Sequence, residues 1–352
     1  MLQSKKDLVL KTLRNSGPFG LLNIALRAAD NKFKPSKAGF LPFTMQIDLT
    51  TNCNLRCKMC EHTYWKEKNH NLSFGEFKKI MDNLPPMALL NLTGRGENLM
   101  NPDIFKIIEY AKKKNAYLWF NDNMTLMGEE NAKKAIRLGL DCIAISFDGA
   151  TKKTYEHIRA GANFEKTVQN IKRLQELKKE LGSEKPELFL VMIVMKENYK
   201  EMPKMVELAK ELGIPEIVFA GALTFKGSKA GSIKKNAKKE FEEINRKTQE
   251  KADELGIKII LPLHETKAFS PSECAYPWTT AYIDCYGNVI PCCFSTQRND
   301  SKVHDESILG NAIEEKFSKI WNSKKYVEFR QKLRSGEPPL ICKSCERVRG
   351  YY

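Results

Sequence analysis

The sequence predicts an α/β fold, a partial (β/α)6 barrel of the TIM type followed by a smaller cysteine-rich segment. Short apolar stretches alternate with amphipathic stretches from residue 43 to residue 223. The apolar stretches are hydrophobic on both faces, as is typical of parallel strands that helices cover on both sides. Each strand and its helix together take about 30 residues, which is the length of a βαβ repeat.

The elements of this barrel can be placed in order along the chain. Strands are predicted at residues 43–50, 87–94, 116–122, 142–149, 187–195 and 216–223, and helices at 72–84, 102–114, 128–139, 163–182 and 199–213. The first helix has the clearest start, because Ser73 is followed three residues later by Glu76, which makes a capping box. In such folds the chemistry lies on the loops after the carboxyl ends of the strands.

Three further segments complete the predicted organisation. Residues 1–42 form an N-terminal arm of two short helices, which we expect to pack on the barrel. A peripheral membrane contact is the alternative for this basic amphipathic arm. Residues 224–273 are a linker with one helix and a short strand. Residues 274–352 form a second, smaller domain with six cysteines.

Composition limits the class of protein. The chain is 42% hydrophobic and 29% charged, which is typical of a globular protein. It has no apolar run of about 18 residues that could span a membrane, and no secretory signal at its start. We therefore expect a cytoplasmic protein. In a reducing compartment, ten cysteines predict metal or redox chemistry rather than disulfides.

The net charge of +15 permits an anionic partner. The densest stretch has six lysines between Lys226 and Lys239. It is most simply a solvated face, with an anion-attracting rim over a site as the alternative. No nucleic-acid partner is expected, because no basic stripe is interleaved with aromatic residues.

Three cysteines follow the first predicted strand with the spacing C-x3-C-x2-C, at Cys53, Cys57 and Cys60. Thiolates bind zinc or iron–sulfur clusters. A structural zinc site needs four protein ligands, and His62 is a possible fourth. A [4Fe–4S] cluster held by three cysteines instead leaves one iron open to an exogenous ligand.

This cysteine motif, on the loop after the first strand, resembles that of the radical S-adenosylmethionine (radical SAM) superfamily. The resemblance implies that Cys53, Cys57 and Cys60 hold a [4Fe–4S] cluster whose fourth iron binds SAM. One electron then cleaves SAM to methionine and a 5′-deoxyadenosyl radical. Met59 stands where the family places a residue, commonly aromatic, that packs on adenine.

A second motif, TGRGENLMNPDI at residues 93–104, resembles the family's glycine–glutamate motif after the second strand. The resemblance implies that Gly94, Gly96 and Glu97 lie along the methionyl group of SAM. Arg95 between the two glycines departs from the usual pattern. Glycines after a strand also make ordinary turns, so this motif alone is weak.

The stretch after the fourth strand, residues 146–171, resembles the SPASM/Twitch branch of the family. There Ser146 would contact SAM and Arg159 would suit its carboxylate. Asn123 stands where family members read T-N-G-T-L-L and is a further SAM contact. Each residue also has an ordinary alternative, such as a turn cap for Ser146 or an ion pair for Arg159.

The C-terminal cysteines resemble the Twitch form of the SPASM extension, which binds one auxiliary [4Fe–4S] cluster. The ligands implied are Cys274, Cys292, Cys342 and Cys345. A zinc ribbon with the same four thiolates is the alternative. Gly287 would allow the tight turn before the ligand strand, and Trp321 would anchor the helix between the two cysteine pairs.

Three of the ten cysteines lie outside the proposed cluster ligands. Cys285 and Cys293 are spare, although either could replace an assigned ligand. Cys142 begins a buried strand and is expected to be a packed apolar residue. The chain thus offers seven assigned ligands for two clusters.

The resemblance implies abstraction of a hydrogen atom from a substrate. We expect a two-electron oxidation of a polyol, sugar or related small metabolite, with the auxiliary cluster as electron acceptor, and the positive net charge permits an anionic substrate. The cysteine spacing is similar to that of the 2-deoxy-scyllo-inosamine dehydrogenases. Substrate contacts are expected around Phe219 to Lys229, and the electron donor would be a protein such as flavodoxin or ferredoxin.

Other functions stay open. The branch also contains peptide-modifying maturases, but 42 residues before the barrel are few for the winged-helix peptide-recognition domain that such enzymes commonly carry. Modification of a lipid or lipid-linked glycan would suit the basic arm. A non-catalytic iron–sulfur carrier would not need the SAM-contacting loops.

Overall fold

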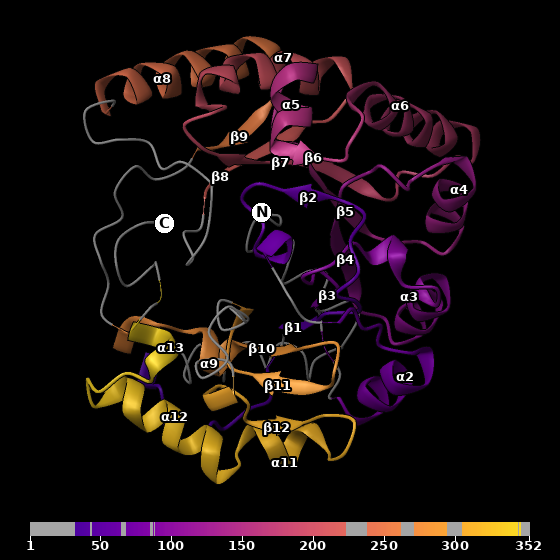
Figure 1. Cartoon of the computed structure of the whole chain (residues 1–352). Coiled ribbons are helices and arrows are strands. Elements are labelled where there is room, and N and C mark those ends of the chain that lie inside the picture. The colour runs from indigo at the N-terminus through magenta and orange to yellow at the C-terminus, as the bar shows by residue number, and fades with distance from the viewer. Residues whose placement is uncertain are drawn as a thin grey trace. The chain divides into compact units, whose positions relative to one another are not determined.

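A computed structural model describes residues 32–42, 44–64, 68–84, 87, 89–222, 238–261, 271–293, 305–343 and 345. The predicted helices before residue 32 and the lysine-rich stretch at 223–237 lie outside these residues. The chain divides into two compact units. Unit 1 comprises residues 1–52, 67–119 and 267–350, and unit 2 comprises 53–66, 120–266 and 351–352. Figure 1 labels the elements of both.

Unit 1 has a mixed sheet with the strand order β12-β11-β10-β1-β3-β4. Its strands are β1 (Thr44–Ile47), β3 (Leu89–Asn91), β4 (Tyr117–Asp122, of which the first three residues belong to this unit), β10 (Thr280–Ile283), β11 (Asn288–Ile290) and β12 (Gly310–Asn311). The first strand runs parallel to both its neighbours, β3 and β10. The strands β11 and β12 continue the sheet antiparallel.

Two helices of unit 1, α2 (Phe74–Asn83) and α3 (Ile104–Lys113), form where the sequence predicts them, and the structure adds further short helices. These are η2 (Asn98–Met100), η5 (Pro271–Glu273), α9 (Tyr276–Thr279), α11 (Phe317–Trp321), α12 (Lys324–Arg334) and α13 (Leu340–Lys343). The capping box at the start of α2 is confirmed, with Ser73 accepting from the N–H of Glu76 and Glu76 accepting from that of Ser73. In Figure 1, α11 and α12 lie near β12.

Unit 2 has four parallel strands in the order β5-β7-β8-β9. These are β5 (Cys142–Ser146), β7 (Glu187–Val194), β8 (Glu216–Gly221) and β9 (Lys258–Ile260). A separate antiparallel ribbon joins β2 (Arg56–Cys57) to β6 (Arg159–Ala160). The helices are η1 (Glu61–Tyr64), α4 (Glu129–Arg137), α5 (Lys152–Ile158), α6 (Phe164–Glu180), η3 (Tyr199–Glu201), α7 (Met202–Glu211) and α8 (Lys238–Leu255).

Burial explains why these segments became strands and helices. The first four residues of β5 are buried, as expected for a parallel strand covered on both faces. Cys142 is one of them, so its predicted role as a packed apolar residue is confirmed. In α3 the buried residues Ile104, Ile107, Ile108 and Ala111 repeat at helical spacing, which places one apolar stripe against the sheet.

The predicted alternation of parallel strands and helices is confirmed, with strands shorter than predicted. The structure adds α5 and β6 between the predicted strand at 142–149 and the helix at 163–182. The compact units also group residues differently from the four predicted segments, because β10 pairs with β1 inside unit 1. Among the described residues, no helix is long and apolar enough to cross a membrane.

Candidate functional site

The cysteine loop begins unit 2 and leads through β2. Cys57 is buried, and Cys53 and Cys60 are half-buried. The backbone folds tightly here, since the N–H of Cys60 donates to the carbonyl of Cys57 over 3.1 Å. Burial raises the pKa of the Cys57 thiol to about 12, and the neighbouring Cys60 and Cys53 add to the rise. The three thiols are therefore close enough to act on one another.

Arg159 supplies the positive charge beside these thiols. Arg159 in β6 is paired in register with Cys57 in β2. Although burial disfavours the charge, attraction to Asp148 and Cys57 raises the pKa of Arg159, and the same guanidinium opposes the rise in the pKa of Cys57. A permanently charged guanidinium at this place stabilises thiolates, which are the form that binds metal.

Asp148 holds Arg159 in place. Its Oδ2 lies 2.7 Å from Nη2 of Arg159, with both side chains buried. Its Oδ1 accepts from the N–H of Ile193 over 2.7 Å, and its carbonyl accepts from Nδ2 of Asn198. The family resemblance implies a role of Arg159 toward SAM, but it does not predict this carboxylate partner. The signal that could have found it is an acidic residue, Asp148, directly after an apolar strand in the sequence S-F-D-G.

Asn123, the residue after β4, binds the cysteine loop through hydrogen bonds. Its Nδ2 donates to Oδ1 of Asn54 over 3.0 Å, and its Oδ1 accepts from the N–H and the hydroxyl of Thr125. Asn54, next to Cys53, donates in turn to the Thr125 hydroxyl over 2.8 Å. The amide predicted to contact SAM therefore also ties the loop to the sheet.

Two more predicted SAM contacts lie in unit 2. Ser146 is the last residue of β5, paired in register with Val191, and is half-buried. Met59 is half-buried in the cysteine loop. Ser146 thus ends a strand, and Met59 lies in the loop after β2.

The glycine–glutamate motif belongs to unit 1. A Cβ atom on Gly96 would lie 2.4 Å from the carbonyl oxygens of both Thr50 and Asn52, and one on Gly94 would overlap Asp48. The N–H of Glu97 donates to the carbonyl of Asn52 over 2.7 Å. The glycines are thus required because their loop packs directly on the backbone that precedes Cys53.

Arg95, the departure from the family pattern, forms a buried cluster. Its Nε lies 2.8 Å from Oδ2 of Asp48, and its Nη2 lies 3.7 Å from the Sγ of Cys285. The hydroxyl of Tyr282 donates to the same carboxylate over 3.3 Å. Against the effect of burial, Asp48 raises the pKa of Arg95. Cys285, one of the two spare cysteines, therefore lies beside a guanidinium in unit 1.

The four predicted auxiliary ligands also lie in unit 1. The pKa of the Cys342 thiol is raised, first by burial and then by the thiols of Cys292, Cys274 and Cys345. These four side chains, from three distant parts of the sequence, are therefore brought into electrostatic contact. Gly287 has the positive φ of 83° expected for the turn before Cys292, so that prediction is confirmed.

The donor sets suit iron–sulfur clusters. Within the described residues, no three His, Cys, Asp or Glu side chains are arranged to hold a single metal ion. A [4Fe–4S] cluster binds each cysteine at a different iron, so its thiolates lie farther apart than the ligands of one zinc ion. Cys53 and Cys60 act electrostatically on Cys57, and Cys274, Cys292 and Cys345 act on Cys342, as expected for two groups of neighbouring thiols.

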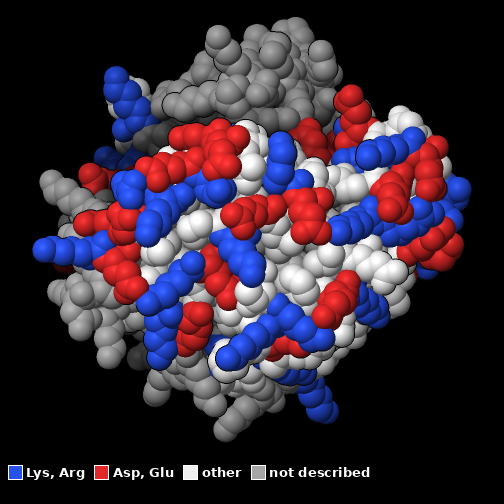
Figure 2. Space-filling view, turned by 90° about the horizontal axis from the view of Figure 1, so that it is seen from above, with Lys and Arg blue, Asp and Glu red and all other residues white. Residues whose placement is uncertain are grey.

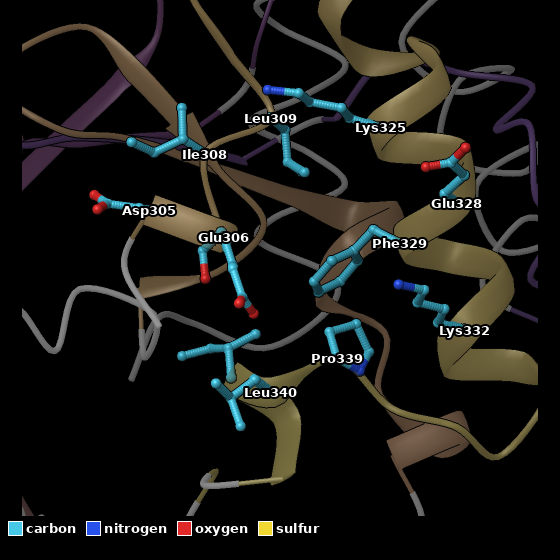
Figure 3. A pocket seen from close by; sticks show the side chains of 12 residues that line it. Asp305, Glu306, Ile308, Leu309, Lys325, Glu328, Phe329, Lys332, Pro339 and Leu340 are labelled. Carbon is cyan, nitrogen blue, oxygen red and sulfur yellow. The ribbon is translucent and has the colours of Figure 1, made fainter. Parts of the chain in front are cut away.

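A cavity of about 460 Å³ lies in unit 1, next in sequence to Cys342. Its apolar part is formed by Ile308, Leu309, Phe329, Pro339, Leu340 and Ile341, and its charged part by Asp305, Glu306, Glu328, Lys325 and Lys332. Figure 3 shows Phe329, Pro339 and Leu340 around this space, with the lysines along α12. The cavity thus combines an apolar surface with charges of both signs.

Comparison with protein-family models gives two matches. Residues 47–209 match the radical SAM superfamily, and residues 274–346 match an iron–sulfur cluster-binding domain, SPASM. The two matches cover the cysteine loop, the glycine–glutamate motif and the four C-terminal cysteines.

Several curated relatives align with most of this chain. A tungsten-containing aldehyde ferredoxin oxidoreductase cofactor-modifying protein of Pyrococcus furiosus is 28% identical over 81% of this chain and 82% of its own length. A PqqA peptide cyclase of Gluconobacter oxydans is 24% identical over 87% and 83%. An AdoMet-dependent heme synthase of Methanosarcina barkeri is 26% identical over 88% and 92%.

Two further relatives are named for maturation or biosynthesis. The mycofactocin maturase MftC of Mycobacterium tuberculosis is 22% identical over 86% of this chain and 75% of its own. The antilisterial bacteriocin subtilosin biosynthesis protein AlbA of Bacillus subtilis is 24% identical over 87% and 64%.

Among solved structures, Streptococcus suis SuiB superposes with a TM-score of 0.68 at 15% identity, covering 98% of this chain and 82% of that one. The structure of anSMEcpe with bound AdoMet gives 0.62 at 19% identity, with 88% of each chain covered. These likenesses confirm the predicted fold, a TIM-like α/β barrel with a C-terminal SPASM domain.

Proposed function

This chain is an enzyme of the radical SAM superfamily with a SPASM iron–sulfur domain, and from that premise we propose that it modifies a peptide. Its cofactors are SAM, the [4Fe–4S] cluster of the radical SAM domain and auxiliary iron–sulfur chemistry in the SPASM domain. When bound, the cluster and SAM supply a radical that abstracts a hydrogen atom from the substrate.

The residues of the cysteine loop hold and tune the first cluster in this proposal. Cys53, Cys57 and Cys60 are its ligands. Arg159 keeps a positive charge beside Cys57 and is available to the carboxylate of SAM, while Asp148 fixes the guanidinium at 2.7 Å.

Other residues of this chain position the SAM-contacting loops. Gly94 and Gly96 let the motif pack against the backbone before Cys53, which sets where Glu97 stands. Asn123 ties the cysteine loop to β4, and Ser146 and Met59 complete the proposed contacts. Positioning of this kind is the contribution that a protein makes to cofactor chemistry.

The SPASM domain holds one auxiliary [4Fe–4S] cluster in this proposal. Its ligands are Cys274, Cys292, Cys342 and Cys345, and the rise that the other three thiols cause in the pKa of Cys342 supports this set. Four cysteines leave no iron open for substrate. Electron transfer during or after the modification is therefore the role that we assign to this cluster.

A peptide is favoured over the small polyol that the sequence led us to expect. The observation that carries this choice is the alignment with a peptide cyclase over 87% of this chain, accompanied by the maturase and the bacteriocin biosynthesis protein.

Modification of a cofactor is the second candidate. The relative with 28% identity is named a cofactor-modifying protein, and another is a heme synthase. Neither a lipid nor a lipid-linked glycan is named among these relatives, so we do not pursue that alternative.

Formation of 5′-deoxyadenosine identifies the substrate class. The enzyme is reconstituted without oxygen and incubated with SAM, a reductant and an extract of the cells that produce it. The amount of 5′-deoxyadenosine formed is compared with that of a reaction without extract. Prior digestion of the extract with an immobilised protease should remove the stimulation, and periodate, which destroys polyols, should spare it. The opposite pattern would overturn the peptide proposal in favour of a polyol.

Iron analysis tests the clusters separately. Wild type should hold about eight irons, from two four-iron clusters, and the variant with Cys53, Cys57 and Cys60 changed to Ala about four. Cys142→Ala is the matched control, because this buried cysteine lies in β5 and should leave the iron count unchanged. About four irons and one zinc in wild type would show that the SPASM site is a zinc ribbon.

A further inference from the structure

Basic side chains cover the outer face of the cysteine loop. In β2 the exposure alternates, so that Arg56 is exposed while Cys57 is buried. Lys58 follows in the loop, and on α5 the exposed Lys153 and His157 lie one turn apart on one face. We call Arg56, Lys58, Lys153 and His157 the ribbon patch. Figure 1 shows α5 beside β6, the partner strand of β2.

Contacts of the loop fix two of these side chains. Nη1 of Arg56 donates over 2.8 Å to the carbonyls of both Cys53 and Leu55. The ammonium of Lys58 contacts the imidazole of His157. The N–H of Lys58 donates over 2.9 Å to the carbonyl of Ile158. The patch is therefore tied to the segment that carries the cluster ligands.

Charges elsewhere on unit 2 are largely neutralised by their neighbours. Basic and acidic side chains alternate over the face in Figure 2. Ion pairs such as Lys172–Glu211 and Arg246–Glu243, both 2.7 Å, explain that mixture.

Two carboxylates near the α5 part of the patch in sequence are engaged with other groups. Glu165 pairs with Lys152 over 2.9 Å, and Glu156 accepts from the N–H of Phe164 over 3.0 Å. In the part of the chain that the structure describes, Arg56, Lys58 and Lys153 form no ion pair with a carboxylate, so the patch presents positive charge.

We propose that the ribbon patch is the docking surface for a small acidic protein that donates one electron. The chemistry needs such a delivery, since the donor loses one electron and the cluster held by Cys53, Cys57 and Cys60 gains it, with no bond made or broken. Opposite charges on the two proteins would steer the encounter.

The route from the patch to the cluster is short. Arg56 neighbours Cys57 in the chain and donates to the carbonyl of Cys53, so a donor protein seated on its guanidinium lies close to two of the ligands. Acidic donors form small, transient interfaces in which charge rather than buried area sets the rate. A patch of four side chains meets that need.

Stopped-flow reduction tests the proposal. The probe is flavodoxin hydroquinone, an acidic one-electron donor, mixed with the reconstituted enzyme while the cluster absorbance is followed. For Lys153→Glu/His157→Glu we expect a bimolecular rate constant about tenfold lower than wild type at low salt. The difference should vanish at about 0.5 M salt, where exposed charges are screened. Reduction by dithionite, a small molecule, should not change.

Two further variants serve as controls for the reduction rate of the double variant. Lys319→Glu is the matched control, an exposed lysine on α11 in unit 1, and should behave as wild type. Lys153→Glu alone changes one solvent-facing side chain of α5, and should give an intermediate rate even if the double variant loses iron.

Three outcomes would overturn the proposal. One is a wild-type rate with flavodoxin that does not change between low and high salt. Another is an equal loss of rate in Lys319→Glu and Lys153→Glu, which would indicate a general charge effect. The third is an unchanged flavodoxin rate in Lys153→Glu together with weaker binding of substrate, which would assign the patch to the substrate instead. None of these results depends on whether the substrate is a peptide.

Discussion

Asp48 and Arg95 form an ion pair with side chains only 1% and 7% exposed. Removing one partner of a buried pair leaves the other charge unsolvated, which costs about 3–5 kcal/mol. We expect Asp48→Asn to lower the free energy of unfolding by that amount. Urea denaturation, monitored by circular dichroism on the protein without added SAM, measures this free energy.

The double variant Asp48→Leu/Arg95→Met is the control for this pair. Apolar replacement of both partners is often neutral, because no buried charge remains. The double variant should therefore recover most of the loss. If Asp48→Asn cost less than about 1 kcal/mol, the pair would be solvated and the buried cluster with Cys285 would be wrong.

Gly96 gives a second prediction for a single residue. A Cβ there would lie 2.4 Å from two carbonyl oxygens, so Gly96→Ala should destabilise the protein by about 1–3 kcal/mol and displace the loop that carries Glu97. Equilibrium dialysis with labelled SAM should show weaker binding. Gly128→Ala is the control, since nothing lies within 4 Å of its Cβ position, and unchanged SAM binding in Gly96→Ala would contradict this account.

Helix α5 depends on an acceptor from a distant segment. Glu201, at the end of η3, accepts from the N–H groups of Ala150 and Thr151 over 2.7 and 3.1 Å, and from the hydroxyls of Thr151 and Thr154. The carboxylate satisfies amides at the start of the helix and complements its dipole.

Glu201→Ala should therefore destabilise the protein by about 3 kcal/mol, the range for loss of hydrogen bonds to a charged group. The change is measured by thermal and urea unfolding. Glu211→Ala, at the other end of α7, removes only an exposed pair with Lys172 and should change the stability by less than about 1 kcal/mol. Equal effects from the two variants would contradict the capping role.

Local signals explain which elements the sequence predicts. The cap of α2 involves Ser73 and Glu76, three residues apart, so it can be read from the chain. The acceptor for α5 is about 50 residues away from it, and no spacing rule connects them. This explains why the α5–β6 insertion was missed although the strands and helices around it were predicted.

The C-terminal segment belongs to the sheet of unit 1. The register of β1 with β10 pairs Thr44 with Thr280 and Ile47 with Ile283. A chain ending at residue 261 would leave β1 with an open edge, which favours aggregation. We expect this truncated chain to elute as aggregates in size-exclusion chromatography.

The full chain with Cys274, Cys292, Cys342 and Cys345 changed to Ser is the control. It loses the auxiliary ligands but keeps β10, so it should elute as a folded protein. A folded, monodisperse chain of residues 1–261 would show that β10 is not required for the sheet.

The site was predictable where its residues lie in one motif and unpredictable where they meet across the sequence. Cys53, Cys57 and Cys60 stand within eight residues. Arg95 was read as a deviation between two glycines, because its partners Asp48 and Cys285 are 47 and 190 residues away. A charged residue inside an apolar strand, as at Asp48, is the general signal that such a partner exists.

The pairing of β1 with β10 has a consequence for the chain while it is being synthesised on the ribosome. The partner of Thr44 is synthesised about 240 residues later, which takes roughly 10 to 50 seconds at ordinary translation rates. During that time the first strand of the nascent chain has an unpaired edge and offers a site to chaperones. Crosslinking of arrested nascent chains should show chaperone bound to those that stop before residue 280, and released from those long enough to expose β10 outside the exit tunnel.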